Sequence, residues 1–87
     1  MTQVNSITDL GFVGGKHLYH LKAEGVTETT TTINMPCDQI QAVVGGALDA
    51  GGLTGIKITH AGNQVTITAD GTVTGDGATF SLFVLGL

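Results

Sequence analysis

Charged side chains are scarce in this chain of 87 residues, where Asp, Glu, Lys and Arg make up 11% of the sequence, against about 25% in an ordinary soluble domain. Only Lys16, Lys22 and Lys57 are cationic, and the formal net charge is −4. Three scattered cations cannot neutralise several phosphates, so the composition argues against a nucleic-acid groove or an anionic membrane surface. Threonine takes the place of charge, most visibly in the run Thr29–Thr32.

Disulfides, a secretion signal and a long apolar segment are also missing. Cys37 is the single cysteine, so no disulfide can form within the chain, and the thiol is expected to be a small buried hydrophobe. No basic stretch followed by an apolar one opens the sequence, and the longest apolar run, Phe80–Leu87, is far shorter than a bilayer span. We therefore expect a protein that stays in the cytoplasm or is assembled there into something larger.

The first half of the chain predicts an arm followed by a β-hairpin. Residues 1–10 show no sustained period and are expected to form a short N-terminal arm. From Gly11 onward apolar and polar side chains alternate, which suits a strand with one buried face. Glu24-Gly25 can close a tight turn before a second strand rich in Thr and Val. We predict a hairpin over residues 11–34.

A helix is predicted over residues 36–51. Pro36 stands near the first helical position, Asp38 lies in the first turn, and Gly51-Gly52 supplies a stop. The apolar residues recur at helical spacing and would form one buried face. These residues are Ile40, Val43, Val44, Ala47 and Leu48.

Small residues without a cation occupy the opposite side of that predicted helix, with Ala42, Gly45 and Gly46 at its centre. Each glycine costs about 1 kcal/mol relative to alanine inside a helix, so tertiary packing would have to hold the helix together. Two interpretations follow: another subunit approaches this stripe closely, or the helix is simply weak and solvated.

The last third predicts a three-stranded β-meander over residues 55–87. Alternating side chains flank Gly62-Asn63, a two-residue hairpin turn that pairs Ile58 with Ile67. The same register pairs Ile56 with Ala69 and Thr59 with Thr66, and a final strand spans Ala78–Leu85. The fold expected for a single domain, residues 1–87, is α+β: a compact antiparallel sheet of about five strands with one helix, in the order β-β-α-β-β-β.

The final strand carries large apolar side chains on both faces. One helix can cover only one face of a small sheet, so we expect the other face of this strand to contact another copy or another protein. One face carries Phe80, Leu82 and Val84, and the other carries Phe83, Leu85 and Leu87. The predicted interface consists of these six residues together with Ala42, Gly45 and Gly46.

No group of residues predicts catalysis. His17 and His20 would point to opposite faces of a strand and so cannot bind one metal together, and His60 is expected on a buried face. Asp70 and Asp76 lie beside glycines, where Asp forms turns far more often than calcium sites. We therefore predict a protein that is not an enzyme and needs no metal or cofactor.

Two Thr-rich segments, Thr27–Thr32 and Val65–Gly77, resemble small virion proteins of tailed bacteriophages. The resemblance implies a capsid decoration or tail-associated protein of the virion, with strands and termini contacting further copies or other virion proteins. It assigns no role to any single residue. A small oligomeric module that binds a ligand or peptide is the alternative, and an enzyme whose site is shared between subunits is a third class.

Overall fold

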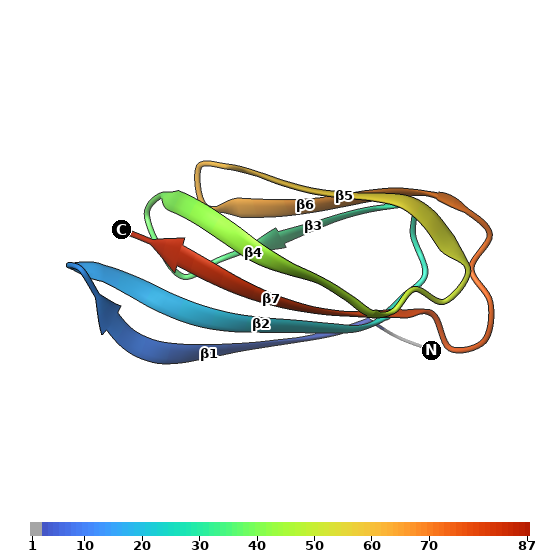
Figure 1. The fold of residues 1–87 in the computed structure, drawn as a ribbon, viewed down its shortest axis with the longest axis horizontal. Helices are drawn as coiled ribbons and strands as arrows, with labels where there is room; N and C mark the ends of the chain where they lie inside the picture. Colours follow the sequence, from blue (N-terminus) through green and yellow to red (C-terminus); the bar gives the residue numbers. More distant parts are fainter. Residues whose placement is uncertain (1–2) are drawn as a thin grey trace.

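The computed structural model describes residues 3–87, which form seven antiparallel β-strands in two sheets (Figure 1). Sheet A has the order β1-β2-β7-β4, and sheet B has the order β3-β6-β5. The strands are β1 Val4–Val13, β2 Lys16–Val26, β3 Thr30–Asn34, β4 Ile40–Asp49, β5 Leu53–Ala61, β6 Gln64–Gly71 and β7 Ala78–Gly86. Within the described residues no helix is long and apolar enough to cross a membrane.

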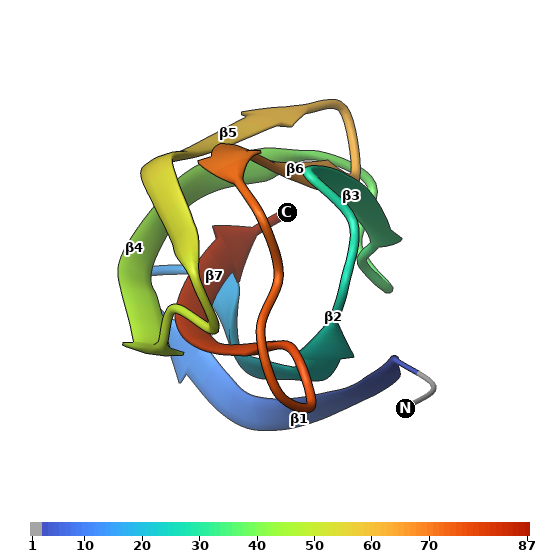
Figure 2. The same cartoon turned by 90° about the vertical axis from the view of Figure 1, so that its right-hand side faces the viewer.

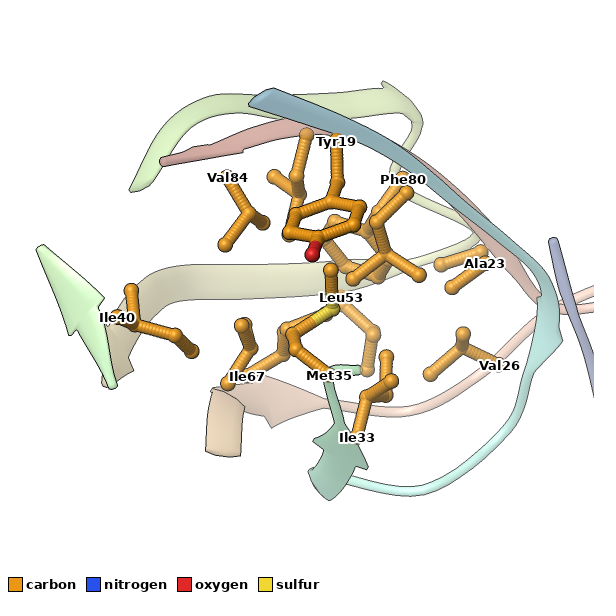
Figure 3. Close-up of a cluster of buried hydrophobic side chains, with 14 residues drawn as sticks. Tyr19, Ala23, Val26, Ile33, Met35, Ile40, Leu53, Ile67, Phe80 and Val84 are labelled. Carbon is orange, nitrogen blue, oxygen red and sulfur yellow. The ribbon is translucent and has the colours of Figure 1, made fainter. Parts of the chain in front are cut away.

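The core lies between the two sheets and takes alternate residues from both (Figure 3). Seen along the long axis, the strands surround it (Figure 2). On β7 every second side chain from Ala78 to Val84 is buried, because successive residues of a strand point to opposite faces. The buried apolar side chains are Tyr19, Leu21, Ala23, Val26, Ile33, Met35, Ile40, Leu53, Val65, Ile67, Ala78, Phe80, Leu82 and Val84.

The α+β prediction is wrong because the segment predicted as a helix is strand β4, paired with β7 along sheet A. Two irregularities, between Ile40 and Ala42 and between Ala47 and Asp49, shift its register. These shifts hide the two-residue period, and the apolar residues then fall at helical spacing by coincidence. Gly45 has φ +136°, a conformation that no helix contains.

The predicted arm and first hairpin are also corrected. Most of the arm, from Val4 onward, belongs to β1, which forms a hairpin with β2 through Gly14-Gly15, while residues 1–2 lie outside the described part of the chain. Glu24-Gly25 closes no hairpin, because β2 pairs with β1 and β7 whereas β3 pairs with β6 in the other sheet. The chain crosses from sheet A to sheet B after Val26, in the segment 27–29 between β2 and β3.

The hairpin around Gly62-Asn63 is confirmed, since β5 and β6 pair Ile58 with Ile67 and Thr59 with Thr66. The predicted pair of Ile56 with Ala69 is wrong, because the register shifts between Thr54 and Lys57. The third strand of the predicted meander also leaves this sheet. β7 crosses to sheet A and lies between β2 and β4, where both of its edges are paired.

Candidate interaction surface

The outward side of β7 carries apolar side chains at the centre of sheet A. Phe83 and Leu85 alternate with the buried Leu82 and Val84, so they point away from the core. Residues directly opposite each other in an antiparallel pair share a face, which extends this surface over β2 and β4. One cross-strand row is His20, Phe83 and Val44, and the next is Leu18, Leu85 and Ala42. We call these six residues the outer apolar face.

Solvent reaches the centre of the outer apolar face. Phe83 is 45% exposed and Val44 is 67% exposed, while Leu18 and Leu85 are partly buried by their neighbours in the sheet. No strand of sheet B lies against this side, because sheet B packs on the opposite side of sheet A (Figure 1). The face is therefore open to a partner.

His20 is the one titratable residue of the outer apolar face, and its contacts are internal. Its Nε2 lies 2.8 Å from the Ser81 hydroxyl oxygen, at hydrogen-bonding distance. Its ring lies 5.2 Å from that of Phe83, measured between centroids, at a tilt of 47°. Such a tilted aromatic pair is a favourable packing geometry. The imidazole therefore fills the surface between Phe83 and β1 and is held there by Ser81.

Formal charge is confined to the border of this face. The next row of the sheet carries Lys22, which pairs with Glu24 at 3.0 Å between Nζ and Oε1. Each charge is neutralised by its neighbour, and the two rows of the face contain no Asp, Glu, Lys or Arg. Depletion of charge at the centre with polar groups at the rim is the composition of protein–protein interfaces.

The structure divides the residues of the predicted interface between two sides. On the outer side of sheet A lie Phe83, Leu85, Ala42 and, in the adjacent row opposite Ser81, Gly46. Phe80, Leu82 and Val84 are buried in the core, whereas Gly45, the partner of Leu82 on β4, is exposed. Leu87 follows β7 at the end of the chain and is 50% exposed. Sheet B, rather than a helix, covers Phe80, Leu82 and Val84 within the single chain.

Sequence reasoning missed two members of the face, Leu18 and Val44. Leu18 lies on the same side of β2 as Lys16, His20 and Lys22, and it is the apolar exception on that polar side. This exception indicates an apolar contact on the outer side of the sheet. The helical spacing places Val44 on the buried side of the predicted helix. Its position opposite Phe83 follows only from the pairing of β4 with β7.

An open pocket of about 430 Å³ lies at the end of sheet A where β2 and β4 end and β7 begins, and it has a polar lining. Three carboxylates and two threonines contribute to it, and no cation does. The lining residues are Glu24, Gly25, Asp49, Gly51, Thr74, Gly75, Asp76, Gly77 and Thr79. Nowhere in residues 3–87 do three or more His, Cys, Asp or Glu side chains converge as metal ligands.

The candidate reactive residues stay apart. His17 and His20 lie on opposite faces of β2, as predicted, and His60 is exposed at the end of β5 rather than buried. Cys37 is partly buried against the core, and burial, with a smaller effect of Asp38, raises the pKa of its thiol. A raised pKa keeps the thiol protonated, which is the opposite of nucleophile activation.

None of the family models, curated proteins or solved structures compared with this chain matches it. The function of this chain is therefore inferred from its own geometry. The outer apolar face is the surface feature that most directly suggests a contact, because it exposes apolar side chains in two rows without Asp, Glu, Lys or Arg.

Proposed function

We propose that this protein is a non-enzymatic structural component of a bacteriophage virion, of the capsid decoration or tail-associated type. It attaches to the protein surface of the particle through the outer apolar face. The observation that carries the proposal is the pair of uncharged rows over β2, β7 and β4, centred on Phe83. The resemblance of the Thr-rich segments to small virion proteins of tailed bacteriophages is the reason for proposing a phage virion as the particle.

The partner surface is expected to be apolar and uncharged. Charged groups on a partner would find no Asp, Glu, Lys or Arg to pair with on these two rows. An apolar partner surface would instead be stabilised by the release of water from both surfaces. Attachment should therefore persist at high salt, because screening weakens only the electrostatic part of an interaction.

The size of the face sets the expected strength of attachment. Two rows over three strands cover roughly 200 Å² in projection, below the about 800 Å² that each partner buries in a stable interface. One copy attached by this face alone should dissociate readily. Durable attachment requires contacts from the rim or several copies that act together.

The test is reattachment of purified protein to particles from which it has been stripped. Phe83→Asp places a carboxylate at the centre of the face and should reduce bound protein at least tenfold. Thr59→Asp, on the exposed side of sheet B, is the matched control and should bind as the wild type does. Thermal unfolding of both variants verifies that they are folded.

Equal attachment of the Phe83→Asp variant and the wild type would refute the role of this face. Absence of the protein from purified particles, measured by mass spectrometry, would refute the virion proposal. Attachment that disappears at high salt would show that charge, rather than the apolar face, carries the contact.

The alternative function, a small oligomeric module that binds a ligand or peptide, has the polar pocket in its favour. Its carboxylates, Glu24, Asp49 and Asp76, suit a cationic or hydroxyl-rich ligand. A ligand that binds only the folded state raises the melting temperature. A saturable rise with polyamines or sugars, abolished by Asp76→Asn, would favour this alternative over attachment.

A further inference from the structure

Strand β1 is the most exposed apolar element of the molecule. The structure exposes nine large hydrophobic side chains among residues 3–87, and five of them lie on β1. These five are Val4, Ile7, Leu10, Phe12 and Val13. Ile7 is 37% exposed although its register partner Leu21 is fully buried. β1 pairs only with β2, and Figure 1 places it at the edge of sheet A away from sheet B.

β1 is also the least protected of the four sheet edges. Natural edge strands avoid pairing with other chains through shortness, bulges, lysine or proline. β3 has five residues, β4 has two register shifts, and β5 has a register shift beside Lys57. β1 has ten residues, contains no Lys, Arg or Pro, and pairs regularly with β2 from Val4 to Asp9 before its single shift.

We infer that a second copy of this chain pairs with β1, antiparallel to it, about a two-fold axis at Ile7. In that register Ile7 lies opposite Ile7 of the second copy, and Asn5 lies opposite Asp9 of the second copy. Ser6 lies opposite Thr8 of the second copy. Apolar therefore meets apolar, a carboxamide donor meets a carboxylate, and hydroxyl meets hydroxyl, which are the favourable cross-strand combinations.

The next position brings Val4 towards Leu10 of the second copy, the residue at which the register of β1 shifts, and both side chains are exposed in the single chain. Neighbouring registers lose this match. Centring the axis on Ser6 sets Asn5 against Ile7, and centring it on Asp9 sets two carboxylates against each other. Because an isologous pairing must satisfy each contact twice, the register at Ile7 is the one that fits a second copy.

The polar groups of this register keep hydrogen-bonding capacity for a partner in addition to their contacts within the chain. Asp9 Oδ1 accepts a hydrogen bond from the Gly11 amide at 2.8 Å, and Oδ2 lies 3.5 Å from His17 Nδ1, so the carboxylate is held in place. It is still about half exposed. The Asn5 side chain accepts from Gln3 through Oδ1, which leaves its amide hydrogens available to donate.

This dimer joins the two copies of sheet A into one continuous sheet of eight strands. Opposed residues of an antiparallel pair share a face of the sheet. The outer apolar faces of the two copies therefore lie on the same side of the eight-stranded sheet. The inference does not rest on the proposed attachment to a particle, but it supplies what such attachment needs. Two small faces fixed side by side bind one surface with much higher avidity than either does alone.

Sedimentation equilibrium of the intact chain is the first test. The wild type is expected to be a dimer at high micromolar concentration, and Ile7→Lys, which sets two lysines together at the axis, should weaken dimerisation at least tenfold. Thr59→Lys on sheet B is the control of equal charge and should remain dimeric. A monomeric wild type, or an Ile7→Lys variant that dimerises like the wild type, overturns the inference.

Thiol cross-linking tests the register itself, in a Cys37→Ser background that removes the native thiol. Ile7→Cys chains should cross-link to each other, because the residue on the axis faces its own copy. Ser6→Cys or Thr8→Cys chains alone should cross-link poorly, whereas a mixture of the two should cross-link well. Equal cross-linking of all three single variants would overturn the register at Ile7.

The same variants separate this inference from the proposed function. Phe83→Asp should abolish attachment to the particle and leave the dimer intact, since Phe83 lies two strands away from β1. Ile7→Lys should abolish the dimer and weaken attachment without removing the attachment surface. A dimer lost in Phe83→Asp but kept in Ile7→Lys would place the contact between copies on the outer apolar face and refute pairing through β1.

Discussion

The outward sides of the two sheets differ in chemistry although both belong to antiparallel sheets of one small molecule. Sheet B presents hydroxyl, amide and lysine side chains in aligned rows, such as Thr32, Thr66 and Thr59. Sheet A presents apolar residues, and each of the nine exposed large hydrophobic side chains of the described chain lies on β1, β4 or β7 or directly follows β7. Sheet B is therefore suited to water, and sheet A to a second layer of protein.

Threonine gives the outer side of sheet B a polar surface with almost no charge. Its β-branched side chain favours the extended backbone, and its hydroxyl is hydrated. Gln64 and Asn34 continue the pattern with a hydrogen bond of 3.0 Å from the Gln64 amide to the Asn34 carbonyl oxygen. Sheet A has bulkier apolar residues on both of its sides, which is the pattern of a sheet covered twice.

The largest effect that can test this comparison is on β7, where inward and outward phenylalanines lie three residues apart. Phe80→Ala should lower the free energy of unfolding by about 3–5 kcal/mol because Phe80 is fully buried. Phe83→Ala should cost about 1 kcal/mol or less, since solvent already reaches its ring. Urea denaturation measures both, and similar losses would mean that the outer side of sheet A is as closely packed as the core.

The next effect separates two adjacent glycines of β4. Gly45 lies against the backbone of β7, where a Cβ would lie 2.9 Å from Leu82 Cα and overlap the Ser81 carbonyl oxygen. Together with its positive φ, this predicts a loss of roughly 2–4 kcal/mol for Gly45→Ala.

Gly46 supplies the matched control, because a Cβ there meets no atom within 4 Å. Gly46→Ala should leave stability unchanged or raise it slightly by restricting the unfolded chain. Thermal unfolding of the pair tests how closely β4 approaches β7 at Gly45. The reverse order of stability would contradict the pairing of β4 with β7.

A smaller effect of opposite sign is expected on the inward side of sheet B. Thr31 is buried opposite Ile67, and its hydroxyl oxygen has no hydrogen-bond partner. Thr31→Val removes that polar group without changing the shape, so stability should rise by about 1 kcal/mol. Thr32→Val, on the outward side, should change stability little, and a gain of equal size there would refute the distinction between the two sides.

The smallest effect concerns the exclusion of water from the core between the two sheets. Tyr19, the only tyrosine of the chain, reports on it through the titration of its phenol. Burial first, and the nearby Asp9 carboxylate second, raise the pKa of its phenol. Its hydroxyl donates to the Pro36 carbonyl oxygen at 3.3 Å.

Since the folded state favours the protonated phenol, its stabilising contribution is complete below the ordinary pKa of about 10 and is lost as the pH rises through the folded-state value. Phenolate absorbance during an alkaline titration should therefore appear above that ordinary value and accompany unfolding. If the phenolate absorbance of Tyr19 appears at the ordinary pKa while the protein stays folded, then sheet B does not keep water away from this side of the core.

Local patterns predicted the structure where turn and strand lie together in the sequence. The β5–β6 hairpin was predicted with its turn and two of its pairs, because Gly62-Asn63 and the alternation on either side of it agree. The two-sided character of β7 was predicted as well, since Phe83 and Leu85 alternate with buried residues. Of the residues in the predicted interface, Phe83, Leu85 and Ala42 lie on the outer apolar face and Gly46 lies in the adjacent row.

The errors occurred in β4, whose partner β7 is distant in the sequence, and in β1, whose partner β2 is adjacent but whose own alternation is unclear. β4 resembles a helix because two register shifts break its alternation, and only its pairing with β7 holds the segment extended. β1 showed no clear period because the inward side of an edge strand outside sheet B is partly solvated. Neither cause can be read within a local window of sequence.

The sequence by itself determined the scarcity of charge, the threonine-rich strands, the alternation of β7 and the turn at Gly62-Asn63, because each follows from residue chemistry over a few positions. Only the tertiary structure decided that β4 is a strand, that β2 and β3 belong to different sheets, and that Leu18 and Val44 join Phe83 on one face. Those outcomes depend on hydrogen-bonded ladders between segments distant in sequence. Such ladders choose among local conformations of similar free energy, so the choice is made by the partner strand rather than by the segment itself.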